Sequence, residues 1–554
     1  MILTGPWLPF VALAFPLLAG LLAAVPALRP RALMLLPVVP LPALALALSE
    51  SPAVTTEVPV LLLGVRLGFD SAAALFLGAS ALLWALAGLY ATAYLRGTDK
   101  PEIFTAFWCL TVTGNFGVFL AQDAVTFYVS FTAVSLPAYV MIVHEATRAA
   151  LRAGRIYMIL ALIGETALFA GLVIACAAAD SLIIAEVRDN LAAAPERDVA
   201  LVLMLVGFGI KAGLVPLHVW LPLAHPEAPT PASAVLSGAI VKAGIFGMIA
   251  FMPAGSTMEA WSHALVAFGL FGAYYGIVAG LGQSNAKATL AYSTVSQMGL
   301  MIAAAGAALV ATAPEHVAAL VALYAVHHGM AKGALFLSVG IAGHVAARGR
   351  VVLLVAVAPV ALSVAGLPLT GGAVAKTALK SDLSGPTAFL VAASAAGTAL
   401  LLLHFWLLLR RDSADASTPD DGMLWAPFLA AGAAALVLPW MVLPAAGLDA
   451  AYVLSFANLW SAAWPLAVAA LIAAAAYALK LKWPSVPAGD LVVAAERIAP
   501  AMRRGRRPVR MGTDWSLPPM GARLDRLEQS LRGWNVAGSA LVAIAVLLTG
   551  LLLL

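Results

Sequence analysis

Long apolar segments recur along the whole chain and are separated by short polar connections. Most are about twenty residues long, enough for a helix to cross the roughly 30 Å hydrocarbon core of a bilayer. Because lipid cannot satisfy open backbone polar groups, we expect these segments to be helices. The pattern predicts an all-α polytopic membrane protein with about sixteen transmembrane helices. The expected spans are roughly 6–25, 31–49, 71–95, 103–121, 123–144, 155–178, 199–221, 230–253, 261–283, 286–311, 317–345, 351–380, 386–409, 424–446, 451–479 and 536–554.

The composition agrees with a membrane protein. Hydrophobic residues make up 63% of the chain and charged residues 10%, whereas about a quarter of a soluble domain is charged. The first apolar run lacks a preceding basic region and a following cleavage site, so we interpret it as a retained span. The two cysteines, Cys109 and Cys176, lie in apolar runs and indicate neither a disulfide framework nor a metal motif. The net charge of +4 does not indicate a nucleic-acid partner, because the basic residues gather in loops.

The basic residues also predict an orientation. Most of them lie in the loops that follow odd-numbered spans and in the segment before the last span. The positive-inside rule therefore places the odd loops in the cytoplasm and the N-terminus outside, in a bacterial inner membrane. The basic residues of the odd loops are Arg29, Arg31, Arg96, Lys100, Arg148, Arg152, Arg155, Lys287, Arg348, Arg350, Arg410 and Arg411.

Four lysines remain that lie within predicted spans. A charge at mid-membrane costs at least about 2.5 kcal/mol. A desolvated amine can release its proton, whereas a guanidinium effectively cannot. One such lysine could be purely structural, but four in one bundle favour groups that gain and lose protons. They are Lys211, Lys242, Lys332 and Lys376.

Histidines accompany these lysines in the sequence. His218 follows Lys211 by seven residues, with His225 in what we expect to be the next loop. A spacing of four places His328 and Lys332 on one helical face. Imidazole titrates near neutral pH and relays protons well. The histidines assigned to the predicted relay are His218, His327 and His328.

Acidic partners for the lysines are scarce. Glu165 is the one carboxylate well inside a predicted span, while Asp123, Glu145 and Glu227 lie at span ends or in loops. Any of them could pair with a lysine. Adjacent residues such as His327 and His328 point to different helix faces, so no metal site is expected, and no cofactor motif is present.

Two of the predicted spans contain residues that break helices. Pro216 interrupts the seventh span, and Gly366 and Pro368 interrupt the twelfth. Unwound backbone at membrane depth survives where it lines a cavity or is buried in protein. Broken helices in corresponding positions of two halves are typical of repeat transporters. Because the breaks lie five spans apart, we predict two inverted five-helix repeats.

The repeats divide the chain into six predicted regions. They are residues 1–100 (spans 1–3), 101–255 (first repeat), 256–411 (second, inverted repeat), 412–480 (spans 14 and 15), 481–535 (a basic amphipathic cytoplasmic segment) and 536–554 (the last span).

Four motifs carry a family resemblance over roughly residues 100–411. They are "KAGLVPLHVWLPLAHPEAPTPASAVLSGAIVKAG" (211–244), "QSNAKATLAYSTVSQMG" (283–299), "HHGMAKGALFL" (327–337) and "GLPLTGGAVAK" (366–376). Together they resemble the antiporter-like subunits of respiratory complex I, of Mrp-type sodium/proton antiporters and of group-4 membrane-bound hydrogenases. The resemblance implies repeated five-helix units and a row of proton-carrying residues.

The resemblance also implies a role for individual residues. Lys211 matches the family's seventh-helix lysine, which switches a proton site, and Lys242 matches the eighth-helix relay. Lys332 and His328 match the central eleventh-helix pair. Lys376 matches the terminal residue that exchanges protons with the far side.

One departure from the family pattern affects the first of these sites. The family carries a glutamate on the fifth helix that pairs with the seventh-helix lysine, and Thr132 occupies that position here. Glu165 is our candidate for the missing carboxylate. If no other acid substitutes, the subunit couples proton movement in a different way or has lost proton pumping.

The polar segment 481–535 contains a basic cluster, "MRRGRRPVR" (502–510). Its later part carries Leu524, Leu527 and Leu531 at helical spacing, which indicates an interfacial amphipathic helix. A solvated basic linker and a docking surface for another subunit remain open alternatives.

These observations favour a proton-translocating, antiporter-like subunit of a multi-subunit membrane complex, with no catalytic site of its own. Its expected partners are other integral membrane subunits, the lipid bilayer and a cytoplasmic redox or enzyme module. Three alternatives stay open: an Mrp-type Na⁺/H⁺ antiporter subunit, a membrane energy-coupling partner of a cytoplasmic inorganic-carbon enzyme, and a structural subunit that does not pump.

Overall fold

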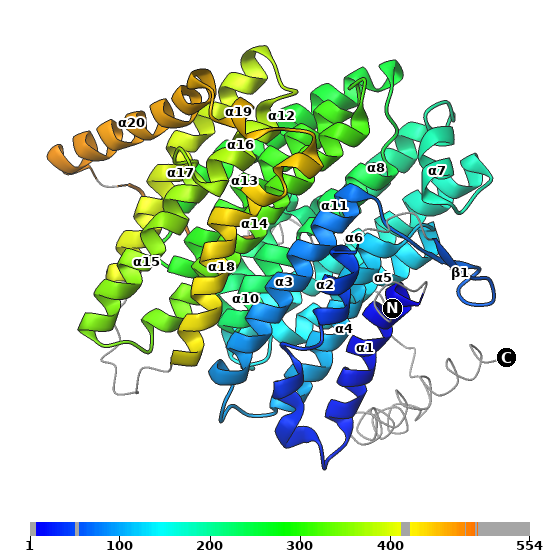
Figure 1. The fold of residues 1–554 in the computed structure, drawn as a ribbon, viewed down its shortest axis with the longest axis horizontal. Coiled ribbons are helices and arrows are strands. Elements are labelled where there is room, and N and C mark those ends of the chain that lie inside the picture. The colour runs from blue at the N-terminus through cyan, green and yellow to red at the C-terminus, as the bar shows by residue number, and fades with distance from the viewer. Residues whose placement is uncertain (1–6, 50–54, 412–421, 482, 494–495, 497–554) are drawn as a thin grey trace, which may run out of the picture.

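A computed structural model describes residues 7–49, 55–411, 422–481, 483–493 and 496. These residues form a bundle of tilted helices (Figure 1). Within the described ranges, twelve helices are long and apolar enough to cross a membrane, which confirms the all-α polytopic fold. The expected last span, 536–554, and the amphipathic stretch before it lie outside the described residues.

The N-terminal region differs from the prediction in its second span. α1 (Leu8–Ala24) is an apolar helix, but the continuous span expected over 31–49 is wrong. A 3₁₀ helix, η1 (Arg29–Leu35), and a short helix, α2 (Leu41–Ala47), occupy that stretch. Pro37, Pro40 and Pro42 explain the difference, because proline removes a backbone donor and blocks a continuous helix. A small antiparallel hairpin of β1 (Thr56–Val58) and β2 (Val65–Leu67) follows.

The middle of the chain builds the core of the bundle. One long helix, α14, is fully buried over its most hydrophobic window and contacts α3, α13, α15, α16 and α18. Its interior position explains why it can carry polar side chains that do not face lipid. The unbroken helices of this part are α3 (Ser71–Tyr94), α4 (Pro101–Leu120), α5 (Ala124–Ile142), α6 (Arg148–Ala179), α7 (Ile184–Leu191), α12 (Glu259–Leu281), α13 (Ala286–Ala308) and α14 (Pro314–Ala342).

Both predicted helix breaks are present. The seventh span consists of α8 (Arg197–Ala212), a 3₁₀ turn η2 (Leu217–Val219) and α9 (Trp220–Glu227). The twelfth span consists of α15 (Ala347–Ala365) and α16 (Gly371–Lys380). Each first half ends at a glycine with left-handed backbone, Gly213 with φ 80° and Gly366 with φ 93°, a conformation that other residues adopt at a cost.

The eighth span contains an irregularity that the sequence did not indicate. Between α10 (Thr230–Val235) and α11 (Lys242–Phe251) lies a π-helical turn, η3 (Leu236–Ile240). Such turns widen a helix locally and change which backbone carbonyls are free to accept other donors. Lys242 lies two residues after it, as the first residue of α11.

The last helices complete the bundle. α17 (Gly385–Arg411) packs against α12, α13 and α15, and α18 (Gly422–Met441) packs against α3 and α14. After the short α19 (Ala450–Val453), α20 (Phe456–Ala478) extends along the edge of the bundle, at the upper left of Figure 1. The inverted relation of the two five-helix units stays a prediction.

Candidate functional site

The four membrane lysines are all buried, and they belong to three separate groups of side chains. Their exposed fractions are 6% for Lys211, 2% for Lys242, 0% for Lys332 and 7% for Lys376. Each amine has at least one oxygen or nitrogen partner within hydrogen-bond reach. The first group lies at the first helix break, the second beside the π turn and the third at the second break.

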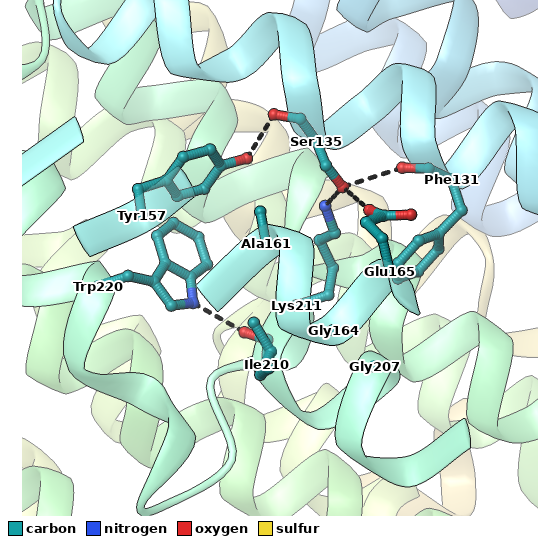
Figure 2. Close-up of a pocket in the computed structure, with 10 residues that line it drawn as sticks. All are labelled: Phe131, Ser135, Tyr157, Ala161, Gly164, Glu165, Gly207, Ile210, Lys211 and Trp220. Atoms are coloured by element: carbon teal, nitrogen blue, oxygen red, sulfur yellow. Dashed lines mark hydrogen bonds between the residues drawn. The ribbon is translucent and has the colours of Figure 1, made fainter. Parts of the chain in front are cut away.

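At the first break, one serine joins a lysine to a carboxylate. Lys211, at the end of α8, donates to the hydroxyl of Ser135 on α5, and the same hydroxyl donates to Glu165 on α6. Thr132 donates its hydroxyl to the other oxygen of Glu165 at 2.6 Å. Figure 2 shows Ser135 between the two charged groups. The residue at the family's glutamate position therefore contacts the carboxylate that we named as its replacement.

Aromatic side chains line one part of this first group. The Lys211 amine lies 4.8 Å from the centre of the Phe131 ring, within the range of a cation–π contact. Tyr157 donates to the Ser135 carbonyl and Trp220 to the Ile210 carbonyl, both at 2.7 Å. The pocket between these side chains offers about 10 Å³ to the centre of a water molecule, roughly the space of one water.

The second group contains two lysines, a histidine and several backbone and hydroxyl oxygens. Lys242 donates to the Ser237 carbonyl in the π turn at 2.7 Å and lies 2.6 Å from Nδ1 of His328. Lys332, one turn beyond His328 on α14, donates to the Leu290 carbonyl at 3.1 Å. The predicted shared face of His328 and Lys332 thus looks toward α11 and α13.

Two hydroxyl groups lie between the residues whose carbonyls accept the same two lysines, Ser237 for Lys242 and Leu290 for Lys332. The Ser237 hydroxyl lies 2.7 Å from the Thr294 hydroxyl. Thr294 in turn contacts the Leu290 carbonyl at 3.0 Å, the same oxygen that receives Lys332. Sequence reasoning missed both hydroxyls, because a serine or threonine in a helix bonds its own backbone as readily as a neighbour.

The third group lies at the second break. Lys376 on α16 donates to the Ala365 carbonyl, the last residue of α15, at 3.1 Å. Nε2 of His327 lies 3.0 Å from the hydroxyl of Ser363, which also accepts the backbone N–H of Gly372 at 3.0 Å. A Cβ at Gly372 would lie 1.6 Å from the Ser363 carbonyl oxygen, so α16 approaches α15 closely because that residue is glycine.

His327 and His328 therefore face different groups, as adjacent helical residues must. His328 points to Lys242 on α11 and His327 to Ser363 on α15. Among the described residues, no group of three or more His, Cys, Asp or Glu side chains is placed to hold a metal ion.

His218 and His225 lie apart from the three groups. His218 is fully buried in η2 and faces Asp490, with Nε2 3.7 Å from its Oδ1. His225 was expected in a loop, but it lies inside α9 and its ring stacks on Phe336 with 4.5 Å between ring centres. The expectation was wrong because α9 continues the broken span after Pro222 instead of ending at the polar residues.

Two cavities accompany these groups. Besides the small one at Lys211, a cavity of about 460 Å³ opens where α3 and α14 begin and α11 ends. Its wall includes Phe246, one helical turn beyond Lys242, and its rim includes Asp70, Arg188 and Glu315. It lies at the opposite ends of the helices from the basic loops.

Comparison with known proteins gives one family. The sequence model described as "NADH:quinone oxidoreductase/Mrp antiporter, TM" matches residues 121–400, a stretch that contains all four membrane lysines. Hydrogenase-4 component B of Escherichia coli K12 is 31% identical over 288 residues, covering 50% of this chain and 44% of that protein. NAD(P)H-quinone oxidoreductase chain 4 1 of Picosynechococcus is 30% identical over 259 residues, covering 44% of this chain and 46% of that protein.

The fold comparison extends further along the chain. The structure of the Mrp complex from Dietzia sp. DQ12-45-1b contains a chain with a TM-score of 0.73 and 22% sequence identity. The match covers 91% of this chain and 60% of that one. This chain thus shares a fold with an Mrp component, while it spans less than half the length of the two curated relatives above.

Proposed function

Because the chain belongs to the NADH:quinone oxidoreductase/Mrp antiporter transmembrane family, we propose that it is a proton-translocating, antiporter-like subunit of a multi-subunit energy-converting membrane complex. Protons move along the buried lysines and histidines, with water completing the gaps between the three groups. The relatives that are named as hydrogenase and quinone oxidoreductase components support this assignment.

One observation carries the proposal. Lys242, Lys332 and Lys376 are almost fully buried, and their hydrogen-bond partners in the described structure are carbonyl oxygens and one imidazole rather than carboxylates. A buried ammonium without a counter-charge costs several kcal/mol. Amines in such positions are therefore suited to hold a proton transiently and to pass it on when a neighbour's charge changes.

Each of the three groups has its own part in the proposed proton transfer. A charge 4–6 Å away alters a neighbour's proton affinity strongly, so protonation of His328 or Lys332 acts directly on Lys242. At the first break, Ser135 couples the charge of Lys211 to Glu165, and we propose that Glu165 takes the place of the family's fifth-helix glutamate. Lys376, beside an unwound segment, exchanges protons with one aqueous side.

The large cavity near Phe246 supports a second opening to water. By the charge of the loops it faces the outside, and it ends one turn from Lys242. We infer that water reaches the middle group from this side when the packing around Phe246 loosens.

Partners and ion follow from the same proposal. The chain assembles with other integral membrane subunits and is driven by a module that it does not itself contain. Sodium dependence separates the two nearest versions: a complex I-like or hydrogenase-like subunit moves protons without Na⁺, whereas an Mrp-type subunit requires a sodium gradient.

The proposal is tested in membrane vesicles that contain the assembled complex. Lys211→Ala and Lys332→Ala are each expected to abolish coupled proton movement while the complex still assembles. Lys332→Arg should also fail, because it keeps the charge but cannot release the proton. Lys100→Ala, an exposed lysine at the start of α4, is the matched control. Unchanged proton movement in both alanine variants would refute the relay.

A further inference from the structure

The chain after α20 returns to the bundle as a strap, here defined as residues 483–493. Its backbone joins the turn between α12 and α13. The Val486 N–H donates to the Gly282 carbonyl at 2.9 Å, and the side-chain amide of Gln283 donates to the Val486 carbonyl at 3.1 Å. These two bonds fix the strap against the turn as a short added segment. The strap lies outside the residues matched by the family.

The strap then crosses to the first broken span. A Cβ at Gly489 would lie 2.6 Å from Leu223 on α9, so the backbone passes close to that helix. Farther along, Glu496 forms an ion pair with Arg152 on α6 at 2.7 Å. The strap therefore spans from the α12–α13 turn to α9, over the ends of helices that carry the basic loops.

One strap side chain enters the bundle at this crossing. Asp490 is 13% exposed and accepts a hydrogen bond from the hydroxyl of Tyr275 on α12. Its other oxygen lies 3.7 Å from Nε2 of His218, whose side chain is fully buried. The His218 ring packs edge-on against Tyr275 at 5.2 Å between ring centres, and Tyr292 on α13 lies 6.0 Å away.

The histidine has no other described partner. Neither ring nitrogen of His218 forms a hydrogen bond within the described residues, and a buried imidazole without a partner is costly. The described groups around the pair are the two tyrosines, with His404 on α17 bound to the nearby Gln283 carbonyl at 2.7 Å. Asp490 is therefore the acid that faces His218.

The carboxylate is held in its charged form. Burial alone would raise the pKa of Asp490, but His218, the Tyr275 hydroxyl and the Leu491 N–H outweigh it and lower the pKa below its ordinary value of 3.8. The carboxylate thus stays ionised at neutral pH and offers a fixed negative charge to the imidazole.

We propose that Asp490 and His218 form a proton-binding site, built jointly by the strap and the first broken span, through which protons reach the first unit. Nε2 of His218 takes a proton from water at the strap face, the Asp490 carboxylate stabilises the resulting imidazolium, and release inward restores the neutral ring. The site rests on the proposed function for its use, but its proton binding is independent of it.

The flux test compares the Asp490 carboxylate with Glu496, the ion-paired residue that follows the strap in the sequence. In vesicles, Asp490→Asn and His218→Gln should each lower proton movement roughly tenfold, because an opposite charge changes a neighbour's proton affinity by about ten- to a thousandfold. The double variant should be no worse than either single one, and Asp490→Glu should recover most of the rate. Glu496→Gln, which loosens the strap without touching the site, should behave as wild type.

Two outcomes would overturn this site while leaving the lysine relay intact. One is wild-type proton movement in Asp490→Asn when Lys332→Ala is inactive. The other is an equal loss in Glu496→Gln, which would mean that docking of the strap matters and the carboxylate does not.

If even the wild type moves no protons, infrared titration of the purified protein tests whether Asp490 and His218 form a shared proton-binding site. We expect a histidine protonation signal that is altered in Asp490→Asn and absent in His218→Gln. A titration identical in wild type and Asp490→Asn would overturn the shared site. Absence of proton movement in the wild type would count against the proposed function alone.

Discussion

The two helix breaks hold their lysines in different electrostatic surroundings. At the first, Lys211 shares the Ser135 hydroxyl with Glu165. At the second, Lys376 donates to the Ala365 carbonyl. Among the described residues, the Ser363 hydroxyl contacts His327 and the Gly372 N–H and no carboxylate. A carboxylate beside the first lysine can balance a proton at rest, whereas neutral oxygens at the second cannot. The similar breaks therefore suit different steps: storage of a charge at one, and exchange with water at the other.

The largest effect is expected from removing the carboxylate at the first break. Glu165→Ala leaves Lys211 buried without a counter-charge and should destabilise the protein by about 3–5 kcal/mol, as for other broken buried pairs. Thermal unfolding of the purified protein measures this. The double variant Glu165→Ala/Lys211→Ala should regain part of the loss. If Glu165→Ala is as stable as wild type, the two breaks do not differ electrostatically.

A smaller effect is expected from crowding the second break. Gly372→Ala places a methyl group against the Ser363 carbonyl, so α16 must move away from α15. Overpacking of this kind costs about 1–3 kcal/mol, and the His327–Ser363 contact should weaken with it. Gly422→Ala, at a glycine with open space around it, is the matched control. Equal stability of the two variants would show that close packing does not hold the second break.

Effects no larger than these are expected from the two serines, and they sharpen the comparison most. Ser135→Ala removes a hydroxyl that bonds charged groups and should cost about 1.5–3 kcal/mol, whereas Ser363→Ala removes neutral bonds worth about 0.5–1.5 kcal/mol. Chemical or thermal unfolding of both variants under one condition gives the ratio. A larger loss for Ser363→Ala would reverse the assignment of charge to the first break.

Much of the fold could be read from the apolar segments, because a membrane span needs length and hydrophobicity and little else. The same simplicity caused the error at 31–49, where three prolines outweighed the apolar composition. The breaks at Pro216 and Gly366 were predictable since both residue types act on the local backbone.

The candidate site was only partly predictable. The four lysines stood out because charge is rare in spans, but their partners lie on helices distant in sequence. Ser135, Ser237 and Thr294 look like ordinary helix residues until packing brings them together. Asp490 gave no signal either, because an acid in a polar segment is normally solvated, and only the return of the strap to η2 buries it.

The central claim is that the buried lysines change protonation in place. ¹⁵N nuclear magnetic resonance of lysine side chains, assigned by Lys211→Ala, Lys242→Ala, Lys332→Ala and Lys376→Ala, observes this directly across the working pH range. We predict that the four side-chain nitrogens titrate and exchange hydrogen with water. Four signals that keep one protonation state and do not exchange would contradict the account.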